Sequence, residues 1–376
     1  MFIWAMEKGD SFLRCRRRRP SNSGSAAAPA HIRSAKHFGA LAATLIFGCL
    51  PVSAAAQGVC EHEPILTTSI VYDRNGRPMV QAELAGHERY LLLDTGGAKS
   101  ILDPETAREL ALRIGQFGPA SESPFERGAS APREAYIDVT GRRSSSFVNV
   151  EDLQLGERNF GAIEFIVSPI GQNQDDLSSP VGTLGADFMI AYDVAFDFGA
   201  DVFQIFAQSP CESSPFSDGI DAGTSIAVPF TTNRSNHMEF PLRLDGQMLM
   251  AVLDTGAHDT ILSLPVAQSV FSIDLNGPDV IRAGEIAGLD IASMYRRRFS
   301  SLQIETLLLL DPMIFLLPDL IAPRAPPQDR IGILRQDPEE NAVLPDFILG
   351  MSVLGRYRLY ISYGQRKFYL APVPSG

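Results

Sequence analysis

Basic residues are scarce in most of this sequence. Of its 376 residues, 32 are Lys or Arg and 44 are Asp or Glu, and the first 56 residues hold eight of the basic and two of the acidic ones. The remaining chain therefore carries 24 basic against 42 acidic residues, a formal net charge of −18. Such an acidic body has no general attraction for a phosphate backbone, and it shows no basic stripe with interleaved aromatic residues. Nucleic acid is therefore not an expected partner.

Cysteine is also rare, with four in the chain. Cys15 and Cys49 lie in an N-terminal segment that we expect to be removed, which leaves Cys60 and Cys211. Two cysteines in an exported protein predict one disulfide, with two free thiols as the alternative. The six histidines show no metal-ligand spacing, so we expect no metal and no cofactor.

Charge is missing altogether between Phe38 and Ala56. Basic residues precede this stretch, its apolar core is Leu41–Val52, and the small residues of Ser53–Gln57 follow. This order is typical of a secretory signal peptide. The core is about a dozen residues long, shorter than the roughly 20 that span a bilayer as a helix.

We therefore expect residues 1–56 to be an N-terminal extension with a signal peptide, and the protein to be periplasmic or secreted. The alternatives are an uncleaved anchor, which would be the protein's only link to a membrane, and a translation start assigned too early. With 45% hydrophobic and 20% charged residues, the rest of the chain is expected to be globular.

One pattern occurs twice in the globular part. Leu84–Gly96 aligns with Leu244–Gly256 at an offset of 160, and both segments continue to an Ile-Leu pair. Further on, Thr183-Leu184-Gly185 aligns with Ile348-Leu349-Gly350 at an offset of 165. Two blocks repeated in the same order predict two homologous lobes, 57–210 and 226–376, joined by a linker at 211–225. The predicted protein is a monomer with an intramolecular pseudo-dimer.

Each lobe has the pattern of β structure. Short apolar or alternating runs are separated by Gly, Asn or Pro turns such as Asn75-Gly76. Helical signals are few, the clearest being Asp103 as a cap before Pro104. The apolar, proline-containing stretch Pro312–Pro327 is predicted to be an inserted loop of the second lobe. The expected fold class is all-β, with two homologous β-barrel lobes related by a pseudo-twofold axis. The strands are expected at 79–84, 90–93, 147–155, 162–167, 202–206, 240–244, 248–253, 300–310 and 367–371.

The repeated Asp-Thr-Gly turn is the chemical core of the pattern. A strand that ends in this tripeptide holds a carboxylate rigidly and offers backbone N–H groups and a hydroxyl beside it. Twofold packing would bring the two carboxylates together, so that they share one proton and their apparent pKa values separate. The ionised partner can then deprotonate water while the protonated one donates to a carbonyl. The predicted catalytic pair is Asp94 and Asp254, and the predicted active-site turns are Thr95-Gly96 and Thr255-Gly256.

The segment Leu253–Leu262 resembles the active-site segment of retropepsin-like aspartic proteases, and Leu93–Leu102 is a looser copy. The second family block, an apolar pair followed by glycine, is similar to Thr183–Phe188 and Ile348–Gly350. The resemblance covers both lobes and implies retropepsin-like (acid protease) β-barrels on a single chain, with a peptide or protein as substrate.

The resemblance also implies substrate-binding positions around the two turns. These are Gly97, where Ala or Ser is usual, and Ala257, Asp259 and Gly284, the last within a flap hairpin at Ala283–Gly288. For the first lobe the flap candidates are Glu126–Gly128 and Asp138–Gly141, and the sequence does not choose between them.

The function that these features favour is an exported aspartic endopeptidase. The alternative is a catalytically inactive, retropepsin-like peptide-binding module, and an outer-surface structural protein is a third hypothesis. Two carboxylates that repel each other are costly to place together, and a peptide-binding module has no need for them. The Asp-Thr-Gly turn in both lobes therefore favours the enzyme.

Overall fold

A computed structural model of the chain describes residues 63–117, 136–137, 143–170, 179–208, 225–233, 236–285, 293–318 and 345–373. The signal segment, residues 211–224 of the linker and both Cys60 and Cys211 lie outside these residues, so the boundaries predicted there stay predictions. Among the residues described, no helix is long and apolar enough to cross a membrane.

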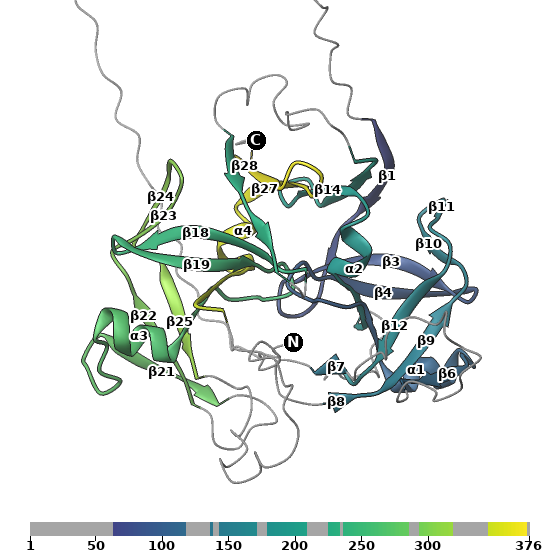
Figure 1. Cartoon of the computed structure of the whole chain (residues 1–376), viewed down its shortest axis with the longest axis horizontal. Helices are drawn as coiled ribbons and strands as arrows, with labels where there is room; N and C mark the ends of the chain where they lie inside the picture. The colour runs from purple at the N-terminus through teal and green to yellow at the C-terminus, as the bar shows by residue number, and fades with distance from the viewer. Residues whose placement is uncertain are drawn as a thin grey trace, which may run out of the picture. The chain divides into compact units, whose positions relative to one another are not determined.

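Among the described residues of the first lobe, 63–208, strands far outnumber helices (Figure 1). The helices described there are α1 (Pro104–Glu109) and α2 (Ala186–Met189). Its strands are β1 (Pro64–Ser69), β2 (Val71–Tyr72), β3 (Pro78–Leu84), β4 (His87–Leu93), β5 (Ile101–Leu102), β6 (Ile114–Gln116), β7 (Tyr136–Ile137), β8 (Arg143–Ser144), β9 (Ser146–Val150), β10 (Leu153–Leu155), β11 (Arg158–Asn159), β12 (Ile163–Val167), β13 (Pro180–Leu184), β14 (Asp193–Asp197) and β15 (Val202–Phe206).

The second lobe, residues 225–373, has the same character. Its helices are α3 (Leu264–Phe271) and α4 (Met351–Leu354). Its strands are β16 (Ile226–Pro229), β17 (Thr231–Thr232), β18 (Met238–Leu244), β19 (Gln247–Leu253), β20 (Ile261–Ser263), β21 (Val280–Glu285), β22 (Ser293–Arg298), β23 (Ser301–Ile304), β24 (Leu307–Leu310), β25 (Met313–Leu317), β26 (Phe347–Leu349), β27 (Tyr357–Ser362) and β28 (Lys367–Pro372).

The two lobes have the same strand order. In lobe 1 the large sheet runs β11-β10-β3-β4-β13-β5-β12-β9-β6, with β2 paired to β3. In lobe 2 it runs β24-β23-β18-β19-β26-β20-β25-β22-β21, with β17 paired to β18. Every strand of one sheet therefore has a counterpart in the other. The prediction of an all-β, acid-protease-like fold with two homologous lobes is confirmed.

A third sheet contains strands from both lobes. Its order is β1-β15-β14-β27-β28-β16, and the lobes meet where β14 pairs antiparallel with β27. Asp193 of β14 is fully buried there and accepts hydrogen bonds from the hydroxyls of Tyr360 and Ser362, at 3.1 and 3.0 Å. This sheet makes the two lobes one continuous structure.

Alternation explains the hairpins that lead to the repeated turns. In β18, Met238, Phe240, Leu242 and Leu244 are buried, and the residues between them are exposed or half-buried. Such a period of two places one face of the strand in the core. The helix α1 begins as predicted, because the Asp103 side chain accepts a hydrogen bond from the Glu105 N–H at 2.8 Å.

Three sequence-based expectations were wrong. The run 147–155 is not one strand but two, β9 and β10, which pair with different neighbours in the large sheet. The run 300–310 is not one strand but the hairpin β23–β24, which turns at Glu305 with φ 48°. The segment predicted to be a loop from Pro312 contains β25, which pairs with β20 and β22 inside the large sheet. Four of the five β25 residues are buried, so the run reads as continuously apolar rather than alternating.

Candidate active site

The two aspartates follow equivalent strands. β4 ends at Leu93 and β19 at Leu253, both fully buried, and each pairs in parallel with the strand that carries the second repeated block. The Asp94 N–H donates to the Leu184 carbonyl and the Asp254 N–H to the Leu349 carbonyl, both at 3.0 Å. The backbone of each aspartate is therefore fixed at the end of a buried strand.

The threonines of the two turns bind each other across the lobe boundary. The Thr95 N–H donates to the Thr255 hydroxyl at 3.1 Å, and the Thr255 N–H donates to the Thr95 hydroxyl at 3.0 Å. The Thr95 hydroxyl donates to the Leu253 carbonyl at 3.1 Å, and the Thr255 hydroxyl donates to the Leu93 carbonyl at 2.6 Å. Both threonines are fully buried. These four bonds hold the two turns in one register.

The glycine of each turn lies against the carboxylate of the other. A Cβ atom at Gly96 would lie 2.5 Å from both carboxylate oxygens of Asp254, and one at Gly256 would lie 2.5 Å from Oδ1 of Asp94. Real Cβ atoms do not come this close to other atoms. Both positions therefore require glycine because the opposite carboxylate lies so close to the backbone, and not because of a positive φ. The structure thus brings the predicted pair Asp94 and Asp254 together between the two turns.

The two carboxylates are close enough to influence each other, because each lies against the glycine of the opposite turn. Burial, and next the charge of Asp94, raise the pKa of Asp254 to about 7, while the hydrogen bond from the Gly256 N–H opposes the shift. The Gly256 and Ala257 N–H groups both donate to Oδ1 of Asp254, at 2.8 and 3.1 Å. The pair can therefore hold one proton near neutral pH.

The second repeated block supports each turn from behind. The Ala186 N–H donates to the Gly97 carbonyl at 2.7 Å, and the Met351 N–H donates to the Ala257 carbonyl at 2.8 Å. A Cβ atom at Gly350 would be 2.9 Å from that same Ala257 carbonyl oxygen. This close backbone packing explains why an apolar pair is followed by glycine in both copies.

Two polar clusters that the sequence reasoning missed tie these blocks together. In lobe 1 the Ser100 hydroxyl donates to Asp187 at 2.8 Å and accepts from the Gly185 N–H at 3.0 Å. In lobe 2 Thr260 and Ser352 bond through their hydroxyls at 3.0 Å. Ser100 and Thr260 stand 160 residues apart, so the repeat itself is the signal that could have identified them.

The predicted substrate-binding residues have different surroundings. Gly97 is half-buried, and a Cβ atom there would lie 2.9 Å from Oδ2 of Asp94. Ala257 is buried, and its N–H donates a hydrogen bond to the Asp254 carboxylate. Asp259 is half-buried, and burial raises its pKa, against the charges of His258 and Arg296. Gly97 and Ala257 therefore support the dyad through their backbone.

The fourth predicted position, Gly284, lies in β21, where a bulge precedes its pairing with Met294 of β22. Its φ of 131° is one that side-chain-bearing residues rarely adopt. The rest of this flap candidate, 286–288, lies outside the described residues. In lobe 1 the equivalent connection joins β6 to β9 and contains both flap candidates. Asp138–Gly141 falls between the paired strands β7 and β8, and both candidates lie outside the described residues.

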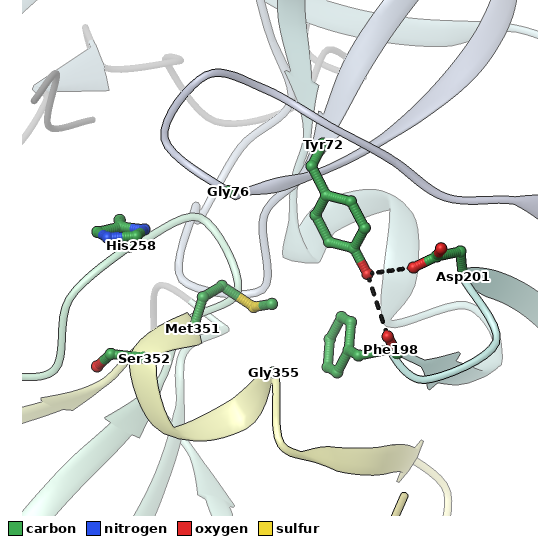
Figure 2. Close-up of a pocket in the computed structure, with 8 residues that line it drawn as sticks. All are labelled: Tyr72, Gly76, Phe198, Asp201, His258, Met351, Ser352 and Gly355. Atoms are coloured by element: carbon green, nitrogen blue, oxygen red, sulfur yellow. Dashed lines mark hydrogen bonds between the residues drawn. The ribbon is translucent and has the colours of Figure 1, made fainter. Parts of the chain in front are cut away.

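A cavity of about 290 Å³ lies beside the lobe 2 turn. Figure 2 shows the Tyr72 hydroxyl directed at Asp201 and at the Phe198 carbonyl, with His258 and Met351 on the lobe 2 side. A Cβ atom at Gly76, in the β2–β3 turn, would be 3.6 Å from Nδ1 of His258. The hairpin turn of lobe 1 therefore contacts the loop that follows the Asp-Thr-Gly turn of lobe 2. Within the described part of the chain, no cluster of three metal-ligating side chains occurs.

Comparison with known proteins gives likenesses of fold. No protein-family model matches the sequence, and no curated protein sequence matches it. Among solved structures, basic 7S globulin from soybean is similar at 8% identity and TM-score 0.43, over 81% of this chain and 94% of that one. Conglutin gamma, a basic 7S globulin from lupine seeds, is similar at 10% identity and TM-score 0.41, over 82% and 95%.

A retropepsin-like aspartic protease from Rickettsia conorii is similar at 17% identity and TM-score 0.26, over 39% of this chain and 91% of that one. These likenesses concern the fold alone. The description of the fold as aspartic-protease-like rests on the strand order and on the paired turns.

Proposed function

We propose that this protein is a retropepsin-like aspartic endopeptidase that hydrolyses peptide bonds in peptides or proteins. The observation that carries the proposal is the juxtaposition of Asp94 and Asp254 at the lobe boundary, where each carboxylate lies against the glycine of the opposite turn and the charge of Asp94 helps to raise the pKa of Asp254. The four threonine bonds hold this pair rigid, and a preorganised acid and base are what the reaction needs.

In this mechanism the dyad carries one proton. The ionised carboxylate takes a proton from a water molecule, whose oxygen attacks the carbonyl carbon of the scissile bond. The protonated carboxyl donates its proton to the carbonyl oxygen. The resulting tetrahedral diol then collapses: the C–N bond breaks, the leaving nitrogen takes the one proton that the dyad holds, and a hydroxyl of the diol returns its proton to the dyad as the new carboxylic acid forms. No covalent intermediate forms.

The experiment is digestion of an unbiased peptide library by the purified protein, followed by mass spectrometry of the products. We expect Asp94→Asn and Asp254→Asn each to reduce kcat/KM by at least about a thousandfold. The double variant should be hardly worse, because residues that act as one unit are strongly non-additive. Glu88→Gln is the matched control, since Glu88 is exposed on β4 in the same lobe.

Two results would contradict the proposal. Peptide binding without cleavage by the wild type would favour the inactive peptide-binding module. Cleavage that survives both aspartate substitutions would place the chemistry elsewhere.

The proposed place of action is the periplasm or the exterior of the cell. The uncharged stretch from Phe38 to Ala56, preceded by basic residues and followed by small ones, supports this proposal. N-terminal sequencing of the protein recovered after cell fractionation tests it. We expect the mature chain to begin near Gln57, and an intact N-terminus on protein in the cytosol would contradict export.

A further inference from the structure

The cavity beside the lobe 2 turn gathers oxygen atoms at its lobe 1 end. The Tyr72 hydroxyl donates to Oδ1 of Asp201 at 2.9 Å and lies 3.5 Å from the Phe198 carbonyl oxygen (Figure 2). The second carboxylate oxygen, Oδ2 of Asp201, has no hydrogen-bond partner among the residues that the structure describes. A hydroxyl, a carbonyl and a carboxylate at one end of a cavity favour a ligand group that donates hydrogen bonds and carries positive charge.

The other walls offer contacts for an apolar stem. In Figure 2 the Met351 thioether extends toward the Phe198 ring, and the Tyr72 ring lies on the opposite side of Phe198. Among the described residues that line the cavity there is one carboxylate and no Lys or Arg. The imidazole of His258 also lines it, with its Nε2 3.8 Å from Oδ1 of Asp259. Aromatic faces attract cations, and a thioether packs well against an alkyl chain.

The equivalent turn of lobe 2 shows that the fold does not require this carboxylate. Asp201 corresponds to Arg366 at the offset of 165, and both have a positive φ, 55° and 54°. The Asp201 carbonyl accepts a hydrogen bond from the Ile70 N–H at 2.7 Å. The Arg366 carbonyl accepts one from the Phe230 N–H at 2.9 Å. The two turns therefore share one backbone structure, which forms with a side chain of either charge.

We propose that this cavity binds an organic cation, an alkylammonium or guanidinium group, with the charge at Asp201 and the stem against Phe198 and Met351. Two sources supply this chemistry. One is a Lys or Arg side chain of a peptide, which rests on the proposed function and defines its substrate class, and the other is a free amine.

The surrounding charge supports a cation. Outside the first 56 residues the formal net charge is −18, which favours the approach of positively charged ligands. Burial, then the hydrogen bond to Asp201, and then the charges of Asp201 and Asp197 raise the pKa of Tyr72 above its usual range. The same negative potential that disfavours a phenolate stabilises a cation beside it.

The lobe 2 wall is joined to the catalytic loop. The Met351 N–H donates to the Ala257 carbonyl at 2.8 Å, and the Ala257 N–H donates to Oδ1 of Asp254 at 3.1 Å. A group bound against Met351 is therefore two hydrogen bonds away from the dyad.

The first test measures binding and does not need activity. N-acetyl-lysine amide and its uncharged isostere N-acetyl-norleucine amide are titrated into the exported protein carrying ¹³C at its methionine methyl groups. The Met351 signal is assigned by its loss in Met351→Leu. The lysine probe should shift this signal and bind about three- to tenfold more tightly than the norleucine probe, because the contact is charge-assisted but Asp201 is exposed.

Asp201→Asn should make the two affinities equal, since asparagine tolerates a positive φ and removes the charge alone. Arg366→Asn, the same product residue in the equivalent turn of lobe 2, is the control and should leave the ratio of affinities unchanged. Equal affinities of the wild type for the two probes, or a Met351 signal that neither probe shifts, would overturn the proposal.

The second test distinguishes the two sources. With a peptide source, library digestion should favour Lys or Arg over norleucine at one fixed distance from the cut, and Asp201→Asn should reduce that preference about three- to tenfold. Binding of the lysine probe without any such preference assigns the cavity to a free amine. Binding of the probe by a protein that cleaves no peptide would uphold the cavity and refute the proposed function.

Discussion

The threonine bonds between the lobes allow a quantitative prediction. Thr95→Val replaces a buried hydroxyl by a methyl group of similar size. The change removes the donor to the Leu253 carbonyl and the acceptor for the Thr255 N–H, at 3.1 and 3.0 Å. Both partners belong to residues that are fully buried, so water does not readily replace the lost bonds.

The expected loss of stability follows from these two groups. A buried polar group left without its partner costs about 1–3 kcal/mol, and the extra buried methyl returns about 1 kcal/mol. Two such groups cost about 2–6 kcal/mol together, so the free energy of unfolding should fall by about 1–5 kcal/mol in Thr95→Val. Thr95→Ser keeps the hydroxyl and loses one methyl, so about 1 kcal/mol is expected. Thr67→Val, at an exposed position on β1, should change stability by less than about 0.5 kcal/mol.

Urea denaturation followed by circular dichroism measures all three variants. In the double variant Thr95→Val with Thr255→Val, the loss should be smaller than the sum of the single losses, because the first opening admits water to the second site. Equal midpoints for Thr95→Val and Thr95→Ser would refute the reciprocal bonding. If the proposed function holds, Thr95→Val should also lower kcat and leave KM nearly unchanged, because the two aspartates are no longer held at a fixed spacing.

The remaining predictions concern the dyad and the cysteines. Gly256→Ala should abolish the contact between the turns and destabilise the fold, whereas Gly364→Ala, whose new Cβ would meet only a side chain at 3.9 Å, should be tolerated in the same thermal melt. Because the pKa of Asp254 is raised to about 7, the folded chain holds a proton between about pH 4 and 7 that the unfolded chain releases. The free energy of unfolding should therefore rise as the pH is lowered from 8 to about 5, and Asp254→Asn should remove that rise. Mass spectrometry of the non-reduced exported protein should find Cys60 joined to Cys211, and alkylation of both as free thiols would contradict the bridge.

Strand positions and the equivalence of the two aspartates could be predicted from the sequence because both depend on local patterns. A period of two marks β3 and β18, and the repeat places Asp94 and Asp254 at equivalent strand ends. β25 was missed because a strand covered on both faces shows no alternation. The β23–β24 hairpin was missed because its turn contains neither Gly nor Asn, the residues that usually identify a turn.

The bonds between the two threonines could not be predicted, for a different physical reason. Thr95 and Thr255 occupy the same position of the repeat, and each donates to and accepts from the opposite lobe. Side-chain contacts across a lobe boundary depend on how the lobes pack, and no local pattern in either copy encodes that packing.

A perfectly twofold site would leave the two carboxylates equivalent. Each would then hold the shared proton half of the time, and neither would be committed as acid or base. In this chain Asp254 accepts two backbone N–H groups, from Gly256 and Ala257, and the residue that follows the turn is Gly97 in lobe 1 but Ala257 in lobe 2. Because both halves lie on one chain, differences such as that between Gly97 and Ala257 can distinguish them. A homodimer of identical lobes could not make that distinction by sequence.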